Sequence, residues 1–252
     1  MRRNVVRAAS ARLAASLLLA LGLVLPAAAA DRALIDMLGY SADGDYFAFE
    51  EYGIQDGSGF AFSSVFVVDL ANDKWTYGTP FEVQAEDETT PLNEVRAKAI
   101  AKAKDKLDEY EIGVPAQIVA LIGDGVANET GRRLNWSTPA CCGAGYTQAD
   151  AFSLILETRG ITSTEDYCKD MSPVGYLLSY QDQSGLRQLH ADGDVLPKSR
   201  GCTLDYRLYG VVQPFQDYFA DGFTSRRVAI VAIYPFGFEG VDRRFMVVPI
   251  DR

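Results

Sequence analysis

Apolar and polar residues alternate along most of the chain in short runs that turn residues separate. In the first third, runs rich in aromatic and β-branched residues lie between Asp-Gly turns and a glycine-rich loop, at residues 34–40, 46–53, 63–70 and 74–78. Alternation of this kind, bounded by turns, predicts antiparallel strands. The same pattern predicts further strands at residues 118–122, 150–158, 175–180, 186–190, 204–214, 227–234 and 244–250.

One segment has a helical period instead. Thr90 as N-cap and Pro91 as first helical residue begin it, and it ends near Tyr110, ahead of Gly113 and Pro115. Apolar residues at steps of three and four predict a stripe that packs on a sheet. That stripe is Leu92, Val95, Ala99, Ala103, Leu107 and Tyr110. We expect the basic residues to face away from it: Arg96, Lys98, Lys102, Lys104 and Lys106.

Many strands and one helix predict a mainly β protein of the α+β class. We expect antiparallel sheets that form a β-sandwich or partial propeller-like sheets, with one amphipathic helix and disulfide staples. A complete propeller would need self-similarity at a fixed period. The helix and the cysteine-containing loops interrupt any such period.

The first 30 residues have the layout of a secretory signal peptide. Four arginines precede an apolar run over residues 13–25, and small residues lead up to Ala30 and Asp31. The run is shorter than the roughly 20 residues that cross a bilayer, so no stable membrane anchor is expected after cleavage. The sequence therefore predicts a signal peptide over residues 1–30 and a single β-rich domain over residues 31–252, located in the periplasm or secreted.

The charge of the chain excludes some partners. The full chain has a formal net charge of −10, and residues 31–252 have −14 because the first 30 residues include four arginines and no acidic residue. A protein this acidic repels phosphate backbones and anionic lipid surfaces, so we expect no nucleic-acid partner. The expected partner is an unknown periplasmic protein or a small ligand.

The four cysteines are Cys141, Cys142, Cys168 and Cys202. An oxidising compartment favours pairing, and adjacent cysteines close only a strained ring, so Cys168 and Cys202 are each expected to bond to one of the adjacent pair. A thiol redox site and a zinc site are the alternatives. The chain has no C-x-x-C pair and one histidine, which favours structural disulfides.

Candidate binding residues lie in predicted loops. Trp136 is in a predicted loop over residues 125–145 and is the best candidate for an exposed aromatic contact. Arg243 and Arg244 are expected to clamp a carboxylate of Glu50, Glu51 or Asp56 if the two loops that contain them are adjacent, and the alternative is an anion site. Arg200 could join either arrangement.

No pattern predicts a metal or a cofactor. Asp-x-Asp pairs occur twice, at residues 43–45 and 192–194, but Asp-Gly is also the common way to close a turn. His190 lies near Asp192, which could suggest a general base. There is no G-x-S-x-G, H-E-x-x-H or P-loop motif.

Several unusual strings point to a family. They are GYSADGDYFAFEEYGIQDGSGF at 39–60, DKW at 73–75, GTP at 78–80, LPKSRGC at 196–202 and GFEGVDRRF at 237–245. With these strings, the chain resembles a family of predicted secreted bacterial proteins, domain of unknown function 2259. The resemblance implies export and a shared fold, and it brings no catalytic residue with it.

Two functional hypotheses follow. The first is a non-enzymatic exported protein that binds a partner or a small ligand, or has a structural role. The second is a carboxylate-dependent hydrolase or carbohydrate-active enzyme that uses Glu50, Glu51 or Glu239. Two carboxylates roughly 5–10 Å apart across an open cleft would favour the enzyme.

The first testable prediction concerns processing. Small residues at Ala28 and Ala30 fit the positions before a cleavage point, so the exported protein should begin at Asp31. N-terminal sequencing of the exported form checks this. An exported form that retains residues 13–25 would contradict it.

Overall fold

Residues 228–233 read Val-Ala-Ile-Val-Ala-Ile, and all six are buried in strand β12 (Val228–Pro235). Neighbouring side chains on a strand point to opposite faces. Val228, Ile230 and Ala232 therefore belong to one hydrophobic core, and the three residues between them belong to another. A strand that is apolar at every position needs a layer on each face. The computed structural model, which describes residues 30–124, 131–137, 151–215, 226–238 and 240–251, has both layers.

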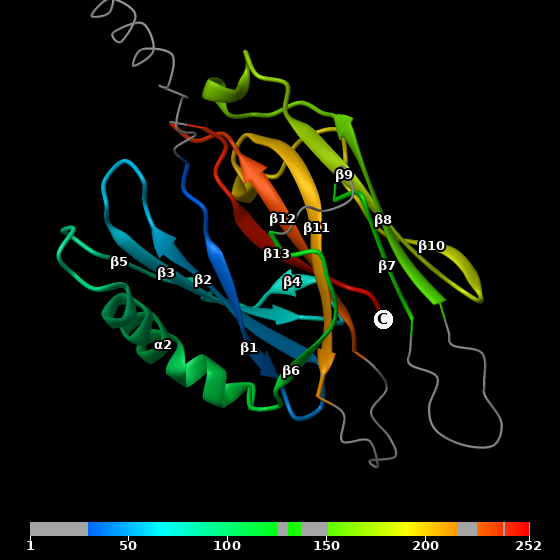
Figure 1. Ribbon diagram of the computed structural model, residues 1–252, viewed down its shortest axis with the longest axis horizontal. Helices are drawn as coiled ribbons and strands as arrows, with labels where there is room; N and C mark the ends of the chain where they lie inside the picture. Colours follow the sequence, from blue (N-terminus) through cyan, green and yellow to red (C-terminus); the bar gives the residue numbers. More distant parts are fainter. Residues whose placement is uncertain (1–29, 125–130, 138–150, 216–225, 239, 252) are drawn as a thin grey trace, which may run out of the picture.

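The central sheet contains β12 and has the strand order β13–β12–β11–β6. Its other strands are β6 (Ala116–Leu121), β11 (Thr203–Pro214) and β13 (Arg244–Pro249), and all pairings are antiparallel. In Figure 1 this sheet lies between two outer sheets. Both β13 and β6 are end strands.

The helix-side sheet covers one face of the central sheet. It consists of β1 (Leu34–Tyr40), β2 (Tyr46–Ile54), β3 (Ala61–Asp69), β4 (Lys74–Trp75) and β5 (Phe81–Gln84), and β4 and β5 both pair with β3. Its inner face is largely aromatic, with Phe47, Phe49, Phe62 and Phe66 in the core that it shares with β12. Burial of these large rings makes this interface a major source of stability.

The disulfide-side sheet covers the other face. Its strands, in the order β10–β9–β8–β7, are β7 (Arg133–Ser137), β8 (Ala151–Gly160), β9 (Val174–Asp182) and β10 (Gly185–Ala191). Leu154, Leu156, Tyr176, Leu178 and Tyr180 pack from it onto the central sheet. Two single-turn 3-10 helices, η1 (Asp166–Cys168) and η2 (Lys198–Arg200), lie in the loops that follow β8 and β10.

Helix α2 (Leu92–Glu109) lies on the outer face of the helix-side sheet (Figure 1). Val95, Ala99 and Ala103 are buried there, which confirms the predicted stripe. Pro91 is the N-cap and the helix begins at Leu92, one residue later than predicted. Asp87 accepts hydrogen bonds from the backbone N–H groups of Thr89 and Thr90 and so shapes the turn before the helix.

The expected outward direction of Arg96 is wrong. Its guanidinium reaches under the helix, hydrogen-bonds Glu50 on β2 at 2.6–3.0 Å and pairs with Asp36 at 2.8 Å. It also stacks on Tyr52 at 3.7 Å from the ring centroid. Glu50 is 1% exposed and accepts a second hydrogen bond, from Ser63 at 2.7 Å. A buried carboxylate needs a cationic partner, and α2 supplies it.

The predicted disulfide connectivity is also wrong. Cys168 is bonded to Cys202, not to one of the adjacent cysteines. The bond joins the loop between β8 and β9 to the segment just before β11, and so links the disulfide-side sheet to the central sheet. Cys141 and Cys142 lie outside the described residues. By restricting the unfolded chain over a separation of 34 residues, the bond stabilises the fold by about 3–4 kcal/mol.

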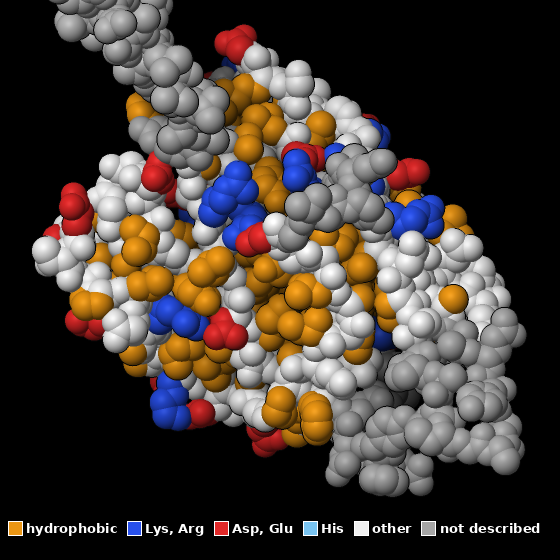
Figure 2. Space-filling model, in the orientation of Figure 1, with side chains coloured by type: hydrophobic (Ala, Val, Ile, Leu, Met, Phe, Trp, Pro, Cys, Tyr) orange, Lys and Arg blue, Asp and Glu red, His pale blue; other side chains and the backbone are white. Residues whose placement is uncertain are grey.

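The predicted class is confirmed: a mainly β protein with several antiparallel sheets, one helix in the described residues and a disulfide. Two short strands, β5 and β7, were not predicted. Hydrophobic side chains gather near the middle of the face in Figure 2, in the region of β6 and β11, and Ile118 and Leu121 of end strand β6 are exposed. Within the described residues, none of the helical segments has the length and apolar character to span a membrane.

The ion pair beneath α2 can be tested against a surface pair on the same helix. Arg96→Ala leaves Glu50 buried without its cation and should lower the free energy of unfolding by about 3 kcal/mol. Lys98→Ala removes only an exposed pair with Glu94 and should cost less than about 1 kcal/mol. Urea denaturation measures both, and equal losses would contradict the structural role given to Arg96.

Candidate functional site

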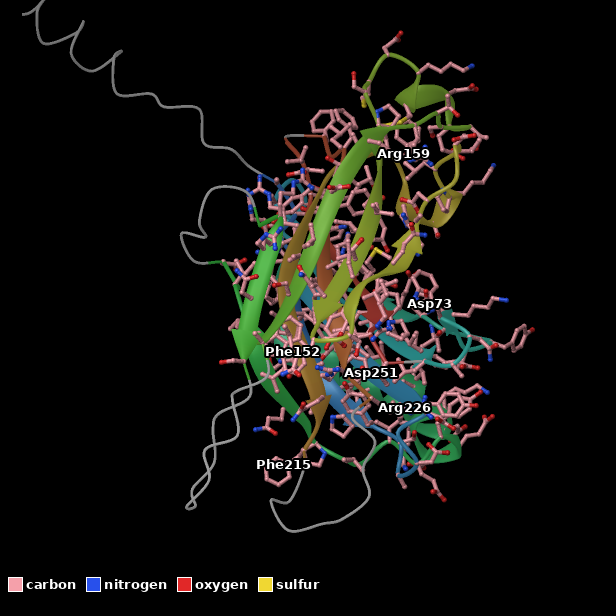
Figure 3. The ribbon with its side chains drawn as sticks, turned by 90° about the vertical axis from the view of Figure 1, so that its right-hand side faces the viewer. Asp73, Phe152, Arg159, Phe215, Arg226 and Asp251 are labelled. Atoms are coloured by element: carbon pink, nitrogen blue, oxygen red, sulfur yellow. A yellow bond between two sulfur atoms is a disulfide. The ribbon has the colours of Figure 1, made fainter. Side chains whose placement is uncertain are left out.

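A cavity of about 850 Å³ lies beside end strand β13, and all three sheets line it. Strands β3, β4 and β5 form one wall, Phe245, Met246 and Val247 of β13 lie between the walls, and the loop at 197–201 with parts of β9 and β10 forms the other wall. In the side view of Figure 3, Asp73 marks the β3–β4 turn on the first wall. The volume is within the roughly 300–1,000 Å³ range of small-molecule sites.

Most of the cavity wall is apolar. Six of the lining residues are Phe62, Phe66, Val68, Trp75, Ile233 and Val247. The indole of Trp75 is 44% exposed and tilts against Phe66 at 5.1 Å between centroids. An exposed tryptophan beside a buried phenylalanine gives a ligand an aromatic surface to contact.

Glu51 is the buried acid of this cavity. It is 4% exposed, and its side chain accepts a hydrogen bond from the backbone N–H of Phe245. Burial raises the pKa of Glu51 to about 7, although the Phe245 N–H and the charge of Arg244 act in the opposite direction. Glu51 therefore changes protonation state near neutral pH.

The Phe245 contact also explains why β13 can end the sheet. Because the Phe245 N–H binds Glu51, it points away from β12, and Pro249, four residues further along the same strand, has no N–H to leave unpaired. End strands with free N–H groups invite other strands to pair. Glu51 and Pro249 each remove one such donor from the edge.

Arg243 and Arg244 do not form the expected clamp. Arg243 is 3% exposed, donates to the Ala33 carbonyl at 2.8 and 3.0 Å and pairs with Asp124. Arg244 instead lines the cavity and stacks on Phe62 at 4.5 Å from the ring centroid. Arg243 therefore has a structural role, whereas Arg244 faces the cavity.

The two loops of the expected clamp are connected through Asp31. The backbone N–H of Asp31 donates to Asp242 at 3.0 Å, and its carbonyl accepts from the Arg243 N–H at 2.7 Å. The Asp31 carboxylate accepts from the Asp56 N–H at 2.7 Å. Three hydrogen bonds thus hold this residue between the β2–β3 loop and the β12–β13 loop.

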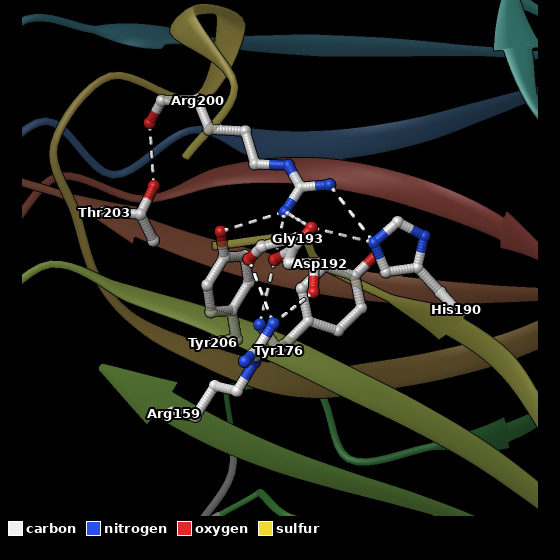
Figure 4. Close-up of polar contacts among 8 residues, drawn as sticks. All are labelled: Arg159, Tyr176, His190, Asp192, Gly193, Arg200, Thr203 and Tyr206. Carbon is white, nitrogen blue, oxygen red and sulfur yellow. Dashed lines mark hydrogen bonds and ion pairs between the residues drawn. The ribbon is translucent and has the colours of Figure 1, made fainter. Parts of the chain in front are cut away.

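Arg200 belongs to a polar cluster on the opposite wall (Figure 4). Its Nη1 donates to both Asp192 oxygens at 2.7 Å and to the Tyr206 hydroxyl at 3.2 Å. Asp192 also accepts from the Tyr176 N–H and contacts His190 Nε2, each at 2.9 Å. Burial alone raises the pKa of Asp192, but these hydrogen bonds and the Arg200 charge outweigh it and hold the pKa below its usual range.

Tyr176 adds an aromatic ring to this wall. Its ring stacks on His190 at 4.5 Å and packs against Tyr206 at 4.7 Å between centroids. The side chain is fully buried, and its hydroxyl has no hydrogen-bond partner within the described residues. A buried hydroxyl without a partner costs free energy, but protein atoms cover this one, so only the ring of Tyr176 contributes to the cavity wall.

The disulfide anchors the cavity wall that holds Arg200. Cys202 follows this residue by two positions, and the Arg200 carbonyl accepts a hydrogen bond from Thr203 at 2.7 Å. Gly201 lies between them with φ of 58°, a conformation that favours glycine. The Arg200 guanidinium is thus held by Asp192, and the Arg200 backbone is held by the Thr203 hydrogen bond and the nearby Cys168–Cys202 disulfide.

The remaining candidates lie elsewhere. Trp136 is on β7 rather than in a loop, and its indole packs against Phe152 at 5.4 Å, partly buried in the core under the disulfide-side sheet. Glu239 lies outside the described residues. Asp43 accepts from Ser41 at 2.6 Å and from the Asp45 N–H, which is a turn contact. Within the described ranges, no group of three or more His, Cys, Asp or Glu residues is arranged to hold a metal.

Comparison with known proteins supports the resemblance seen in the sequence. Residues 48–251 match the family described as predicted secreted protein (DUF2259). The chain belongs to this family. The match includes every cavity-lining residue named above, so the site is part of the family's domain. No curated protein and no solved structure matches the chain.

The raised pKa of Glu51 predicts a pH effect on stability. The folded protein holds this proton up to about pH 7, against an ordinary pKa of 4.5, so the free energy of unfolding should fall as the pH rises between these values. The loss amounts to roughly 3 kcal/mol and is complete above pH 7. Glu51→Gln keeps an acceptor for the Phe245 N–H but cannot ionise, and should lose less stability between pH 5 and pH 8.

Urea denaturation of the wild type and the variant at both pH values measures this difference. Glu157→Gln, at an exposed position of β8, is the matched control and should follow the wild type. The same pH dependence in Glu51→Gln and the wild type would contradict the assignment.

Proposed function

We propose that this protein is an exported, non-enzymatic binding protein that holds a small amphipathic ligand in the cavity beside β13. The observation that supports the proposal most directly is the cavity itself: about 850 Å³, with more apolar than polar surface and with charged groups such as Glu51, Arg200 and Arg244 in its walls. Ligand sites in proteins have this composition. The ligand lies between the sheets, whereas the sequence analysis pointed to the loops.

We also propose the periplasm as the site of action, with a mature chain that begins at Asp31. The disulfide suits an oxidising compartment. The hydrogen bond from the Asp31 nitrogen to Asp242 supports the cleavage position, because cleavage after Ala30 would turn this nitrogen into an ammonium group that faces a carboxylate. A charge-assisted hydrogen bond is stronger than a neutral one.

A carboxylate-dependent hydrolase is the second candidate, and one observation favours it. Glu51 and Glu82 both line the cavity, and a pKa near 7 suits a general acid or base. Glu50 is not available for this role, since it lies on the opposite face of β2 and pairs with Arg96. His190 contacts Asp192 at 2.9 Å, but Arg200 donates to both oxygens of the same carboxylate and neutralises its charge.

Binding of a neutral apolar dye tests the proposed function. N-phenylnaphthylamine should gain fluorescence when it enters the cavity of the wild-type protein. Ser64→Trp fills the cavity from β3 and should weaken binding by about tenfold or more, a loss of about 1.4 kcal/mol. Ser153→Trp, at a half-buried serine of β8 outside the cavity, should bind as the wild type does.

Absence of dye binding, or equal binding by both tryptophan variants, would contradict a ligand site in this cavity. Hydrolysis of ester or glycoside substrates by the wild type, abolished in Glu51→Gln, would favour the second candidate instead.

A further inference from the structure

Arg244 and Glu51 face the same cavity without touching each other. Both residues line it, and the Arg244 charge acts on the Glu51 carboxyl, yet no ion pair within 4.0 Å joins them. The guanidinium of Arg244 lies on the Phe62 ring and makes no hydrogen bond or ion pair with any residue that the structure describes. A cation and a carboxyl group therefore line the same cavity without an ion pair between them, and a third group could contact both.

A carboxylate is the group that fits this role best. A guanidinium presents its N–H groups as a planar fork that matches two carboxylate oxygens, and the contact with the Phe62 ring holds the Arg244 guanidinium at the cavity wall. When Glu51 is protonated, its O–H can donate to the same carboxylate. Two carboxyl groups that share one proton form a strong pair, whereas two ionised ones repel.

The charges around the cavity favour a single negative charge on the ligand. Arg200 is already neutralised by Asp192, whereas Arg244 forms no ion pair within 4.0 Å among the described residues, although its charge also acts on Asp242. The charged groups that act on Glu51 are Arg244 from β13 and Glu82 from β5. The other charged groups of the cavity are the Arg200–Asp192–His190 cluster on one wall and, on the other, Asp73 of the β3–β4 turn and Lys74 of β4. A dianion would add a charge that no free arginine balances.

The rest of the cavity fits an apolar body. Phe66, Val68, Trp75 and Val247 give an apolar wall, and the ring of Tyr176 lines the cavity from the disulfide-side sheet. An acyl or aromatic chain would bury its surface along this wall.

We propose that the ligand of this cavity is an amphipathic monocarboxylate, held with its carboxylate between Arg244 and protonated Glu51, and that its binding takes up one proton. The proposal rests on the proposed function and names the ligand class for the same site. The ligand's negative charge makes Glu51 harder to ionise, so binding and proton uptake reinforce each other. Affinity should fall as Glu51 ionises.

The test compares a fluorescent fatty acid with its uncharged ester. Dansylaminoundecanoic acid and its methyl ester are titrated into the full protein at pH 6 and pH 8.5. The acid should bind more than about tenfold more weakly at the higher pH, because Glu51 must regain its proton. The ester should bind about equally at both pH values. Calorimetry of the acid in buffers of different ionisation enthalpy should show uptake of about 0.75 proton near pH 7.5, the fraction of Glu51 that is ionised in the free protein.

Two variants and a control assign the effect to residues. Glu51→Gln can donate to the ligand at any pH and should remove the pH dependence of acid binding. Arg244→Met keeps an apolar chain over Phe62 and should weaken acid binding about tenfold or more, with ester binding unchanged. Arg207→Met, which removes an arginine that stacks on Tyr234 and pairs with Asp205, should match the wild type.

The outcomes separate this proposal from the proposed function. If acid and ester bind equally and without pH dependence, the carboxylate site is wrong but the cavity still binds ligands. If Arg244→Met weakens acid and ester alike while its circular dichroism is native, the arginine does not recognise charge and the proposal is also wrong. If neither probe binds, the proposed function fails as well.

Discussion

The fold depends on one constraint: strand β12 is apolar on both faces and must be covered twice. Its alternate residues belong to two separate cores, one shared with the aromatic face of β2 and β3 and the other with Leu154, Leu178 and neighbours of the disulfide-side sheet. At about 25 cal/mol per Å² of buried apolar surface, neither outer sheet could be lost without exposing a full core. The layered arrangement follows from this requirement.

The cavity is a result of the same arrangement. The central sheet ends at β13, while both outer sheets contribute residues beside that strand, so the layers cannot close on each other there.

Two adjacent residues of β2 show the two ways in which a buried carboxyl group is accommodated. Glu50 keeps its charge and pairs with Arg96, whereas Glu51 faces the cavity and holds its proton up to about pH 7.

Strands, helix and fold class could be predicted from the sequence because alternation and helical periodicity are local signals. Contacts between distant residues could not. Arg96 resembles the other basic residues of its helix, and only the position of Glu50 on the sheet turns it inward. Trp136 was predicted in a loop because the glycines and cysteines around its five-residue strand hide the alternation of that strand. The cavity could not be predicted because it depends on how the three sheets stack, and the periodicity of a sequence does not encode stacking.

The order in which the sheets occur along the chain differs from the order in which they stack. The helix-side sheet and its helix are complete at residue 109, whereas the strands that cover its aromatic face, β12 and β13, come from residues 228–249. A chain synthesised from its N-terminus therefore presents Phe47, Phe49 and Phe66 on an uncovered sheet until nearly all of it has emerged. Such a surface attracts other chains, so this topology calls for rapid completion or for a chaperone that shields the sheet until the last strands arrive.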